Sequence, residues 1–440
     1  MTPMDTPICE FLQNYCATDA ARFHMPGHKG RLTLPTAWDI TEVAGADALF
    51  EADGILLRSE ENAAALYGAS ATLYSAGGST LSIQTMLSLA CRPGDVVVAA
   101  RNAHAAFYHS CELLDLRPVY VLPDYADAHG VGGSLPPSRI ADALTSHPEA
   151  KAVYLTSPDY MGHLADIERT AAVCQEAHLP LLVDNAHGAH LRFLPQDQHP
   201  ITLGAAACCD SAHKTLPVLT GGGYLHLSPR YCRDEAKAAM ARFGSTSPSY
   251  LILASLDQCN AYLAGEAKSD FAQLAKVHQR LSAVAQKAGW QPDLRTDPTK
   301  LTLDPSGLGY TGMEAAAYLR RQGIELEYAG PDRLVLLMTP CNREEDFDRL
   351  AAALASIPPR EPIASVPFQP PAPVCRLSPR EAAFAPAETV AVDDAGGRIC
   401  AETKITCPPG VPLVAAGEEI TTALQKVLKN CSIQTLKVVK

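Results

Sequence analysis

From about residue 60 onward, short apolar runs alternate with alanine-rich segments of helical period, and this alternation restricts the possible folds more than any other feature. The apolar runs are DVVVAA at 95–100, RPVYVL at 117–122, KAVYLT at 151–156 and LPLLVD at 179–184. They are typical of strands that are buried on both faces. The segments between them, such as STLSIQTMLSLACR and DIERTAAVCQEA, have helical spacing. The pattern predicts an α/β fold with a mainly parallel sheet covered by helices.

The chain is too long for one compact core, so we expect several domains. A long helical segment is predicted near 248–288, and TKLTLDP, GIELEYAG and RLVLLMTP are predicted strands of a smaller α+β domain. Residues 357–373 follow and are too rich in proline to form a helix or a central strand. We predict an N-terminal loop or arm at 1–40, a large domain at 41–290, a small α+β domain at 291–358, a linker at 359–373 and a C-terminal module at 374–440.

Charge and composition exclude several classes of partner. The net charge is −12 and there is no basic run, so we expect neither nucleic acid nor an anionic membrane surface as a partner. No apolar run is long enough to span a membrane, and no signal or transit peptide is recognisable, which favours a cytoplasmic protein. The 14 cysteines are scattered, as is typical of reduced and buried thiols, so we expect no metal site.

Polar residues that follow the predicted strands are the candidates for chemistry, because ligands of α/β sheets bind at the carboxyl ends of the strands. In SAGGSTLSIQT, Ser79 and Thr80 follow a glycine turn and could bind a phosphate at a helix N-terminus, although a simple helix cap is the commoner reason for such residues. Asp184 is the last residue of the run at 179–184. It either binds a ligand or caps the next helix. His104 could stack on a ring or move a proton, or it could be an ordinary hydrogen-bonded residue.

Lys214 lies in DSAHKTLPVLTGGG, behind Ser211 and His213, and burial there would let its amine form an imine with a carbonyl ligand. A second His-Lys pair ends in Lys29, which we interpret as a lid or partner-facing residue of the arm. A phosphate-binding turn, a ring-facing imidazole, a carboxylate for a ring nitrogen and an amine then follow one another along the chain. These are the four needs of pyridoxal 5'-phosphate.

The sequence resembles the Orn/Lys/Arg decarboxylase family of pyridoxal phosphate enzymes, which has the fold type I of aspartate aminotransferase. The resemblance covers nearly the whole chain and is to the short form, without an amino-terminal wing domain. It rests on FHMPGHKG, DITEVAGADALFEADGIL, RNAH, TSPDYMG, DNAHGAHLRF, DSAHKT, STSPSYLILASLD and CPPGVPLVAAGEEIT, which occur in family order. It implies a carboxy-lyase that acts on arginine, lysine or ornithine for polyamine synthesis, and at least a homodimer with the active site between subunits.

The resemblance also implies residue roles. Lys214 becomes the imine-forming lysine, Asp184 the partner of the pyridine nitrogen, and His104 the residue that stacks on the ring. By the same resemblance, the phosphate is bound by Gly78, Ser79, Thr80, Ser211 and His213. The ring lies beside Ala186 and His187. The acid that protonates the α-carbon stays open between Lys214, His104 and a residue of a neighbouring subunit.

The chain departs from the family pattern at three places, and these leave the substrate open. Ala105 and Ala106 stand where Lys-Ser is usual, glycines 221–223 follow Thr220 where Leu-Thr-Gln is usual, and Asp159 stands where Thr is typical. Asp159 either favours a cationic substrate or is solvated at the surface. The candidates for reading the distal charge of the substrate are Glu325 and Glu327. Two alternatives remain, namely another fold type I reaction such as transamination, lyase or aldolase chemistry, and a catalytically retired regulatory homologue.

Overall fold

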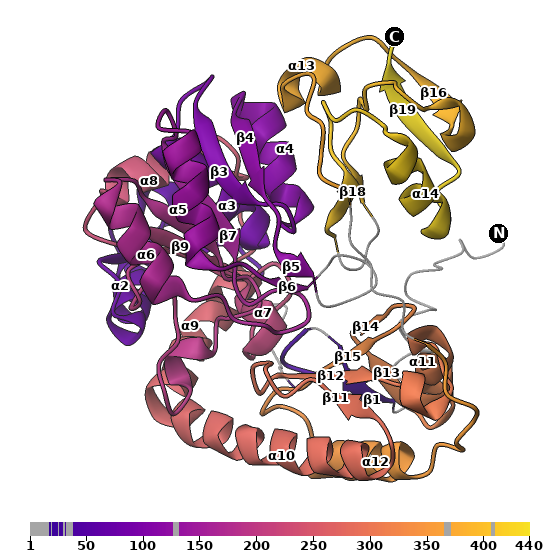
Figure 1. Cartoon of the computed structure of the whole chain (residues 1–440). Coiled ribbons are helices and arrows are strands. Elements are labelled where there is room, and N and C mark those ends of the chain that lie inside the picture. The colour runs from indigo at the N-terminus through magenta and orange to yellow at the C-terminus, as the bar shows by residue number, and fades with distance from the viewer. Residues whose placement is uncertain are drawn as a thin grey trace, which may run out of the picture.

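A central sheet, a smaller sheet with its helices, and a C-terminal module make up the computed structural model of the chain (Figure 1). The structure describes residues 17–18, 20–24, 26–29, 31, 38–125, 132–364, 371–405 and 410–440. Much of the predicted N-terminal arm, part of the linker and residues 406–409 therefore lie outside the described residues. Among the described residues, no helix combines the length and apolar character that crossing a membrane requires.

The central sheet has seven strands in the order β2-β10-β9-β8-β7-β3-β4. Only β10 runs antiparallel to its neighbours, so the predicted mainly parallel α/β sheet is confirmed. The four predicted runs form β3, β4, β7 and β8, whereas β2, β9 and β10 were not predicted. The strands are β2 (Ala71–Ser75), β3 (Val96–Ala100), β4 (Arg117–Val121), β7 (Ala152–Thr156), β8 (Leu181–Asp184), β9 (Ala207–Asp210) and β10 (Gly223–Leu227).

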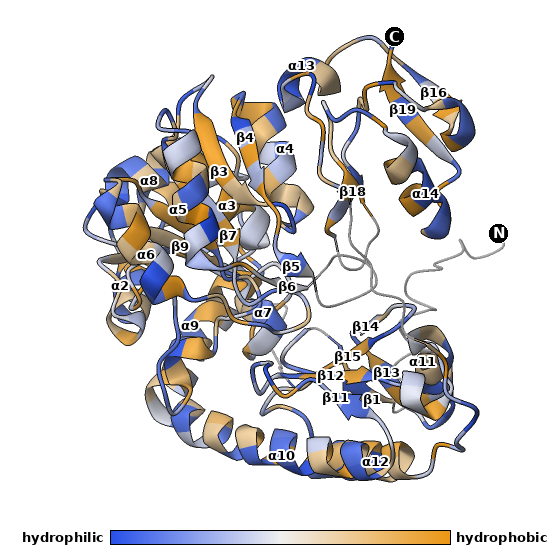
Figure 2. Ribbon diagram, viewed as in Figure 1, coloured by the Kyte–Doolittle hydropathy of each residue, from blue (hydrophilic) through white to orange (hydrophobic). Residues whose placement is uncertain are grey.

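Helices cover both faces of this sheet because successive side chains of each strand point to opposite faces. Val97 packs into one apolar cluster and Val98 into another, and both are fully buried. The first cluster includes side chains of α3 (Gly78–Ala90), α4 (Ala105–Leu114) and α8 (Arg233–Met240), and the second includes side chains of α5 (Pro137–Ser146) and α6 (Ile167–Glu176). In Figure 2, β3, β4 and β7 are accordingly mostly hydrophobic. The large-domain region also contains η2 (Leu49–Glu51), α2 (Ile55–Tyr67), β5 (Asp124–Tyr125), β6 (Gly133–Ser134), η3 (Leu191–Phe193) and α7 (Ala212–Thr215).

The smaller sheet lies beside the central one and is antiparallel, in the order β11-β12-β15-β14. The region around this sheet contains β11 (Gln291–Pro292), β12 (Lys300–Asp304), η4 (Ser306–Leu308), α11 (Gly312–Arg321), β13 (Ile324–Leu326), β14 (Tyr328–Ala329), β15 (Leu334–Leu337) and α12 (Glu344–Ala355). The helical segment predicted near 248–288 is present as two helices, α9 (Tyr250–Gly265) and α10 (Ala267–Lys287), which meet at Glu266.

Part of the predicted N-terminal arm is a strand instead of a loop. β1 (Ala21–Phe23) pairs in parallel with β13, and the side chains of Ala21 and Phe23 are fully buried. The Phe23 ring packs 6.2 Å from the ring of Phe347 on α12. Burial of these apolar side chains explains why so short a segment joins the small-domain region.

The C-terminal module has its own apolar core and two small antiparallel sheets, β16 with β19 and β17 with β18. Its elements are α13 (Pro379–Ala383), β16 (Ala387–Ala391), η5 (Val392–Asp394), β17 (Lys404–Ile405), β18 (Pro412–Val414), α14 (Thr422–Asn430) and β19 (Thr435–Val439). Helix α13 packs against α4 (Figure 1), and Arg101, which directly follows β3, pairs with Glu418 of the module, so the module lies next to the carboxyl end of β3. The domain boundaries themselves stay a prediction.

Candidate active site

A cavity of about 380 Å³ opens at the carboxyl ends of the parallel strands of the central sheet. It brings together the ten residues that the resemblance assigns to the cofactor, namely Gly78, Ser79, Thr80, His104, Asp184, Ala186, His187, Ser211, His213 and Lys214. These residues follow four different strands, so their meeting is a consequence of the parallel topology. Sequence reasoning did not assign the further lining residues Asn102, Thr156, Tyr160 and Val411.

Asp184 ends β8 and is 1% exposed. Its carboxylate accepts hydrogen bonds from the backbone N–H of Ala186 at 3.1 Å and from the Tyr154 hydroxyl at 3.3 Å. Since a buried carboxylate is costly without an opposite charge, the site favours a ligand that presents a cationic group here.

Lys214 lies on α7, the short helix after β9, and its Nζ is 3.0 Å from Nε2 of His187. Burial, and next the charge of Lys214, hold the pKa of His187 well below its ordinary value. His187 is therefore neutral and accepts a hydrogen bond from the Lys214 ammonium. The Tyr160 ring packs edge-on against His187 at 5.2 Å, so it limits the movement of the imidazole.

A polar cradle faces the start of α3. Gly78 has a φ of 62°, which favours glycine, and its N–H donates to the Gly221 carbonyl at 2.7 Å. The Ser79 and Ser211 hydroxyls are 2.7 Å apart. Burial lowers the pKa of His213 to about 4, so its ring is neutral, and Nδ1–H donates to the Gly222 carbonyl at 2.9 Å. Hydroxyls beside the N-terminus of a 13-residue helix suit a phosphate.

The glycines at 221–223 have a packing role. A Cβ at Gly223 would lie 2.6 Å from the Asp210 carbonyl oxygen, and one at Gly222 would collide with Val218. Only residues without a side chain let the chain enter β10 this close to β9 and α3. The departure from the family pattern at these positions therefore follows from packing beside the cavity.

His104 caps the N-terminus of α4 at the mouth of the cavity, where its Nδ1 accepts a hydrogen bond from the Ala106 N–H at 3.1 Å. Burial lowers the pKa of its ring, and the charge of Asp184 opposes this effect. Gly410 of the C-terminal module lies against the ring, and a Cβ there would be 2.7 Å from Nε2. Ala105 and Ala106 are each 4% exposed, so these departures line the protein interior.

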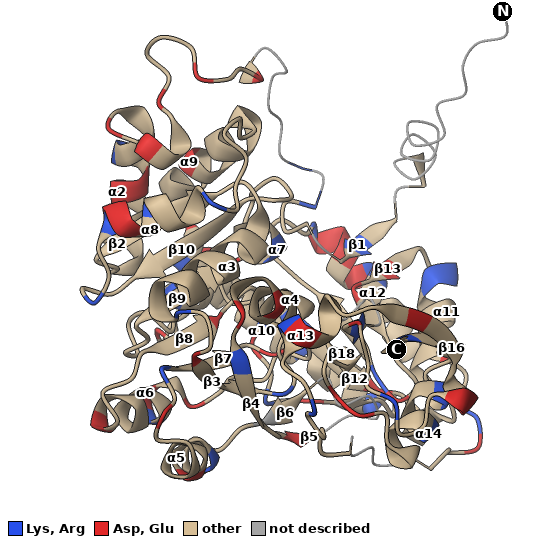
Figure 3. Ribbon diagram, turned by 90° about the horizontal axis from the view of Figure 1, so that it is seen from above, with Lys and Arg blue, Asp and Glu red and all other residues tan. Residues whose placement is uncertain are grey.

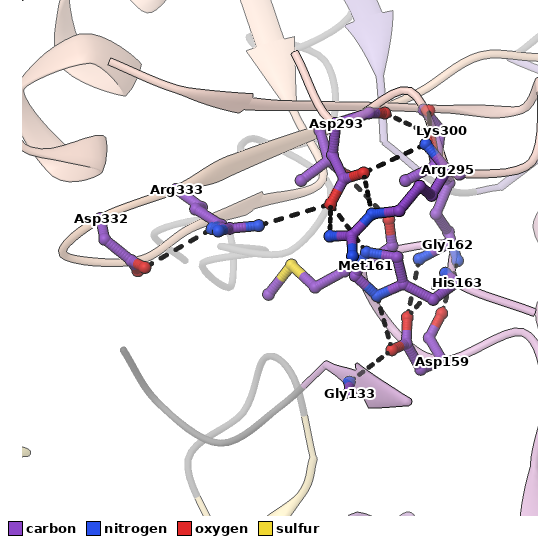
Figure 4. A network of polar contacts seen from close by, with 12 residues as sticks. Gly133, Asp159, Met161, Gly162, His163, Asp293, Arg295, Lys300, Asp332 and Arg333 are labelled. Carbon is purple, nitrogen blue, oxygen red and sulfur yellow. Dashed lines mark hydrogen bonds and ion pairs between the residues drawn. The ribbon is translucent and has the colours of Figure 1, made fainter. Parts of the chain in front are cut away.

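Asp159 does not fit either sequence interpretation. Its side chain is buried, and it accepts hydrogen bonds at 2.9 Å from the backbone N–H groups of Gly133, Gly162 and His163 and from the His163 ring (Figure 4). A carboxylate with four donors is neither solvated at the surface nor available to a cationic substrate.

The two glutamate candidates face different surroundings. Glu325 accepts a hydrogen bond from Arg320 at 2.8 Å in an ion pair that is partly exposed. Glu327 accepts one from the Tyr160 hydroxyl at 3.0 Å, and Tyr160 lines the cavity. Glu327 is therefore the candidate whose charge lies next to the site.

The interpretation of Lys29 as a lid or partner-facing residue is wrong within this chain. Lys29 is 8% exposed, and its ammonium donates to the backbone carbonyls of His24 at 2.6 Å and Leu337 at 3.0 Å. The neighbouring Gly27 N–H donates to the His213 carbonyl at 2.6 Å. A Cβ at Gly27 would lie 2.5 Å from the Leu216 carbonyl oxygen. This part of the FHMPGHKG motif thus supports the helix that carries Lys214.

Comparison with known proteins decides the family. Residues 6–286 match the family described as Orn/Lys/Arg decarboxylase, major domain, and residues 368–434 match its C-terminal domain. The chain belongs to the Orn/Lys/Arg decarboxylase family. Two Bacillus subtilis relatives are the uncharacterized protein YaaO, 32% identical over 98% of this chain and 95% of that protein, and an arginine decarboxylase, 29% identical over 98% and 94%.

Solved structures confirm the fold that the sequence predicted. The constitutive lysine decarboxylase of Escherichia coli has a TM-score of 0.75 at 18% identity and covers 99% of this chain and 78% of its own. The lysine decarboxylase of Francisella novicida has a TM-score of 0.77 at 16% identity, over 89% of this chain and 73% of its own. The chain is thus a fold type I enzyme, a decarboxylase with pyridoxal 5'-phosphate as cofactor.

The cavity fits this cofactor. Two buried polar atoms of its lining, Thr156 Oγ1 and His187 Nδ1, have no hydrogen-bond partner among the described residues. The cofactor carries hydrogen-bonding groups, a phosphate and a ring nitrogen, and the cavity offers a hydroxyl cradle at one helix N-terminus and a buried carboxylate at Asp184. Lys214 supplies the amine between them.

Proposed function

We propose that this protein decarboxylates a basic amino acid, arginine, lysine or ornithine, and releases carbon dioxide and an amine for polyamine synthesis. The observation that carries the proposal is the meeting of Lys214, Asp184, His104 and the phosphate cradle in one cavity. Arginine decarboxylases that match nearly the whole chain support a basic substrate.

We infer the following roles for the side chains. Lys214 would hold the cofactor through its amine, and Asp184 would keep the proton on the ring nitrogen. Pyridoxal phosphate supplies a conjugated ring that accepts the electron pair released when the substrate carboxylate leaves. Ser79, Ser211 and the N-terminus of α3 would bind its phosphate, and His104 would lie against the ring. The candidates for returning a proton to the α-carbon stay Lys214, His104 and a residue of a neighbouring subunit.

We assign the recognition of the distal substrate charge to Glu327. It is joined to the cavity through Tyr160, at 3.0 Å, whereas the charge of Glu325 is offset by Arg320. Its negative charge raises the pKa values of Lys29, Lys300 and His213, against the larger lowering caused by burial. A substrate cation would experience the same attraction.

We further propose a cytoplasmic homodimer or larger homo-oligomer. Trp38, Ile40 and Val43 are 46%, 40% and 51% exposed in a segment that extends away from the body before α2 (Figure 3). Exposed apolar side chains in one segment favour contact with a second copy. The eleven cysteines within the described residues are free thiols, as a reducing compartment requires.

The test is carbon dioxide release from arginine, lysine and ornithine by the protein loaded with pyridoxal phosphate. We expect release from one of the three, and its loss in Lys214→Ala but not in the exposed control Lys151→Ala. A yellow, folded protein that releases none from any of them would contradict a basic substrate and favour another fold type I reaction. A colourless protein that binds no cofactor would instead favour the retired homologue.

A further inference from the structure

His163 lies between two carboxylates that come from different parts of the chain. Its Nδ1 is 2.9 Å from Asp159 Oδ2 and its Nε2 is 2.8 Å from Asp293 Oδ2. The side chains of His163, Asp159 and Asp293 are 11%, 4% and 9% exposed. Asp159 and His163 belong to the loop after β7, and Asp293 follows β11 of the smaller sheet (Figure 4). We call this trio the His163 bridge.

The geometry makes the His163 ring an imidazolium. Asp159 accepts three backbone N–H groups, and Asp293 accepts Nε and Nη2 of Arg295 at 3.0 and 2.7 Å, so both carboxylates are surrounded by donors. An ionised carboxylate can only accept hydrogen bonds, so both ring nitrogens must donate. Burial opposes this charge, but the hydrogen bonds to Asp159 and Asp293 outweigh it and raise the pKa of His163 to about 9.

The charges around the bridge balance. Arg295 and Arg333 approach Asp293, the latter at 3.6 Å, and Arg333 also approaches Asp332 at 3.6 Å. The three carboxylates here are Asp159, Asp293 and Asp332. The three cations that face them are His163, Arg295 and Arg333. Lys300 of β12 donates to the backbone carbonyl of Asp159 at 3.3 Å and adds a positive charge nearby. Loss of the imidazolium charge would remove the cation that lies between Asp159 and Asp293 and donates to both.

The same loop reaches the cavity through Tyr160. The Tyr160 ring packs against His187, the partner of Lys214, and its hydroxyl donates to Glu327 between β13 and β14. A backbone hydrogen bond joins the same two parts of the chain, since the Asp297 N–H donates to the Gly162 carbonyl at 3.0 Å. The His163 bridge and the Tyr160–Glu327 hydrogen bond thus join one loop to the small-domain region at two places.

We propose that His163 is a positioning residue for substrate recognition, whose charged ring fixes the loop of residues 157–163 to the smaller sheet and so holds Tyr160 and Glu327 together at the cavity. Its effect on substrate rests on the proposed function, in which Glu327 attracts the distal cation. The Asp184 carboxylate is held by the Ala186 N–H and the helix of Lys214 by the Gly27 N–H, so the bridge acts on binding of the substrate more than on the chemical step.

The first test is nuclear magnetic resonance of the histidine ring nitrogens in the whole holoenzyme. We expect one histidine signal of a ring that is protonated on both nitrogens at pH 7.5 and titrates near pH 9. This signal should be absent from the spectrum of His163→Gln. The exposed His147, paired with Glu149, supplies the control variant His147→Gln. Assignment of a His163 signal that loses its proton below pH 7 would overturn the proposal.

Kinetics then separate positioning from a general loss of structure. In His163→Gln we expect KM for the basic amino acid to rise about tenfold with kcat changed less than about twofold, as for a loss of ground-state binding. His163→Arg keeps a planar cation with several donors and is expected to recover part of the change in KM. An unchanged KM in His163→Gln, or equal losses in the Gln and Arg variants, would contradict a positioning role of the charge.

A third measurement does not depend on the substrate. Hydrogen exchange of backbone amides at 157–163 and 293–300 is expected to be faster in His163→Gln and in Asp293→Asn than in the wild type, and unchanged in His147→Gln. If no carbon dioxide is released but this exchange pattern appears, the bridge holds and the proposed function fails. Unchanged exchange in both bridge variants would overturn the bridge itself.

Discussion

At the scale of single residues, the site depends on buried polar groups that satisfy one another below the cavity. Asp210, at the end of β9, accepts hydrogen bonds from His199 at 3.0 Å, His226 at 3.2 Å and Asn185 at 2.7 Å. Burial opposes its charge, but these contacts hold the pKa of Asp210 well below its ordinary value. Asn185 follows Asp184 directly, so this cluster fixes the chain that carries the ring-facing carboxylate.

We therefore expect Asp210→Ala to lower the free energy of unfolding by about 3 kcal/mol or more, because three buried donors lose their acceptor. Urea unfolding of the cofactor-free protein measures this change. Asp53→Ala, at an exposed position, is the control and should change the value by less than about 0.5 kcal/mol. Equal effects of the two variants would show that the buried cluster contributes little.

The positions of single residues were predictable where a strand end decided them. Asp184 and Lys214 follow strands of one parallel sheet, so topology alone brings them together. Thr156, the last residue of β7, obeys the same rule and the rule could have identified it. Tyr160 and Val411 reach the cavity from a loop and from the C-terminal module, and no local pattern predicts such contacts. The second carboxylate that binds His163 was also hidden, because Asp293 lies far along the chain.

At the scale of elements, a buried ion pair attaches the C-terminal module to the central sheet. Arg101 follows β3 and contacts Glu418 at 3.2 Å, with side chains 7% and 3% exposed. Its guanidinium also donates to the Tyr108 hydroxyl at 2.8 Å and to the Pro412 carbonyl at 3.0 Å. Next to this contact, the Ala105 N–H donates to the Gly410 carbonyl at 2.8 Å. The pair thus places the module beside His104.

Removal of one partner of this pair should be costly. We expect Glu418→Ala to lower the free energy of unfolding by about 3–5 kcal/mol, because the Arg101 charge stays buried without its carboxylate. The adjacent Glu419 is a matched control, since its pair with Arg376 is exposed and should contribute at most about 1 kcal/mol. Urea unfolding of both variants distinguishes the two environments, and a Glu419→Ala effect as large as that of Glu418→Ala would refute the assignment.

The elements that the sequence missed have physical causes in common. β10 begins with a glycine-rich turn that contains Gly222 and Gly223, which lowers strand propensity although packing requires those glycines. β1 has only three residues, and it forms because it can pair in parallel with β13. The predicted helix near 248–288 was continuous in its pattern, and the bend at Glu266 between α9 and α10 is decided by tertiary packing.

At the scale of the whole molecule, buried cations give opposite contributions to the dependence of stability on pH. The pKa of His163 is raised from 6.5 to about 9, so the native state binds more protons than the unfolded state in this window. Its contribution is complete below about pH 6.5 and is lost as the pH rises through about 9. Burial lowers the pKa of Lys29 to about 7 and that of Lys300 to about 8, both from 10.5. Those two lysines make the native state more stable as the pH rises.

Because these contributions oppose each other, the wild-type profile alone does not identify His163, and the difference from His163→Gln does. We expect the wild type to exceed the variant in free energy of unfolding by up to about 3 kcal/mol at pH 6, and the difference to shrink steadily between pH 6.5 and 9. Urea unfolding in one buffer series at constant ionic strength measures both proteins. Lys29→Met should change the profile in the opposite sense, by removing stability that is gained between pH 7 and 10.5. A constant difference between wild type and His163→Gln from pH 6 to 10 would mean that the pKa of His163 is the same in the folded and the unfolded protein, since only a difference between these two pKa values makes stability depend on pH.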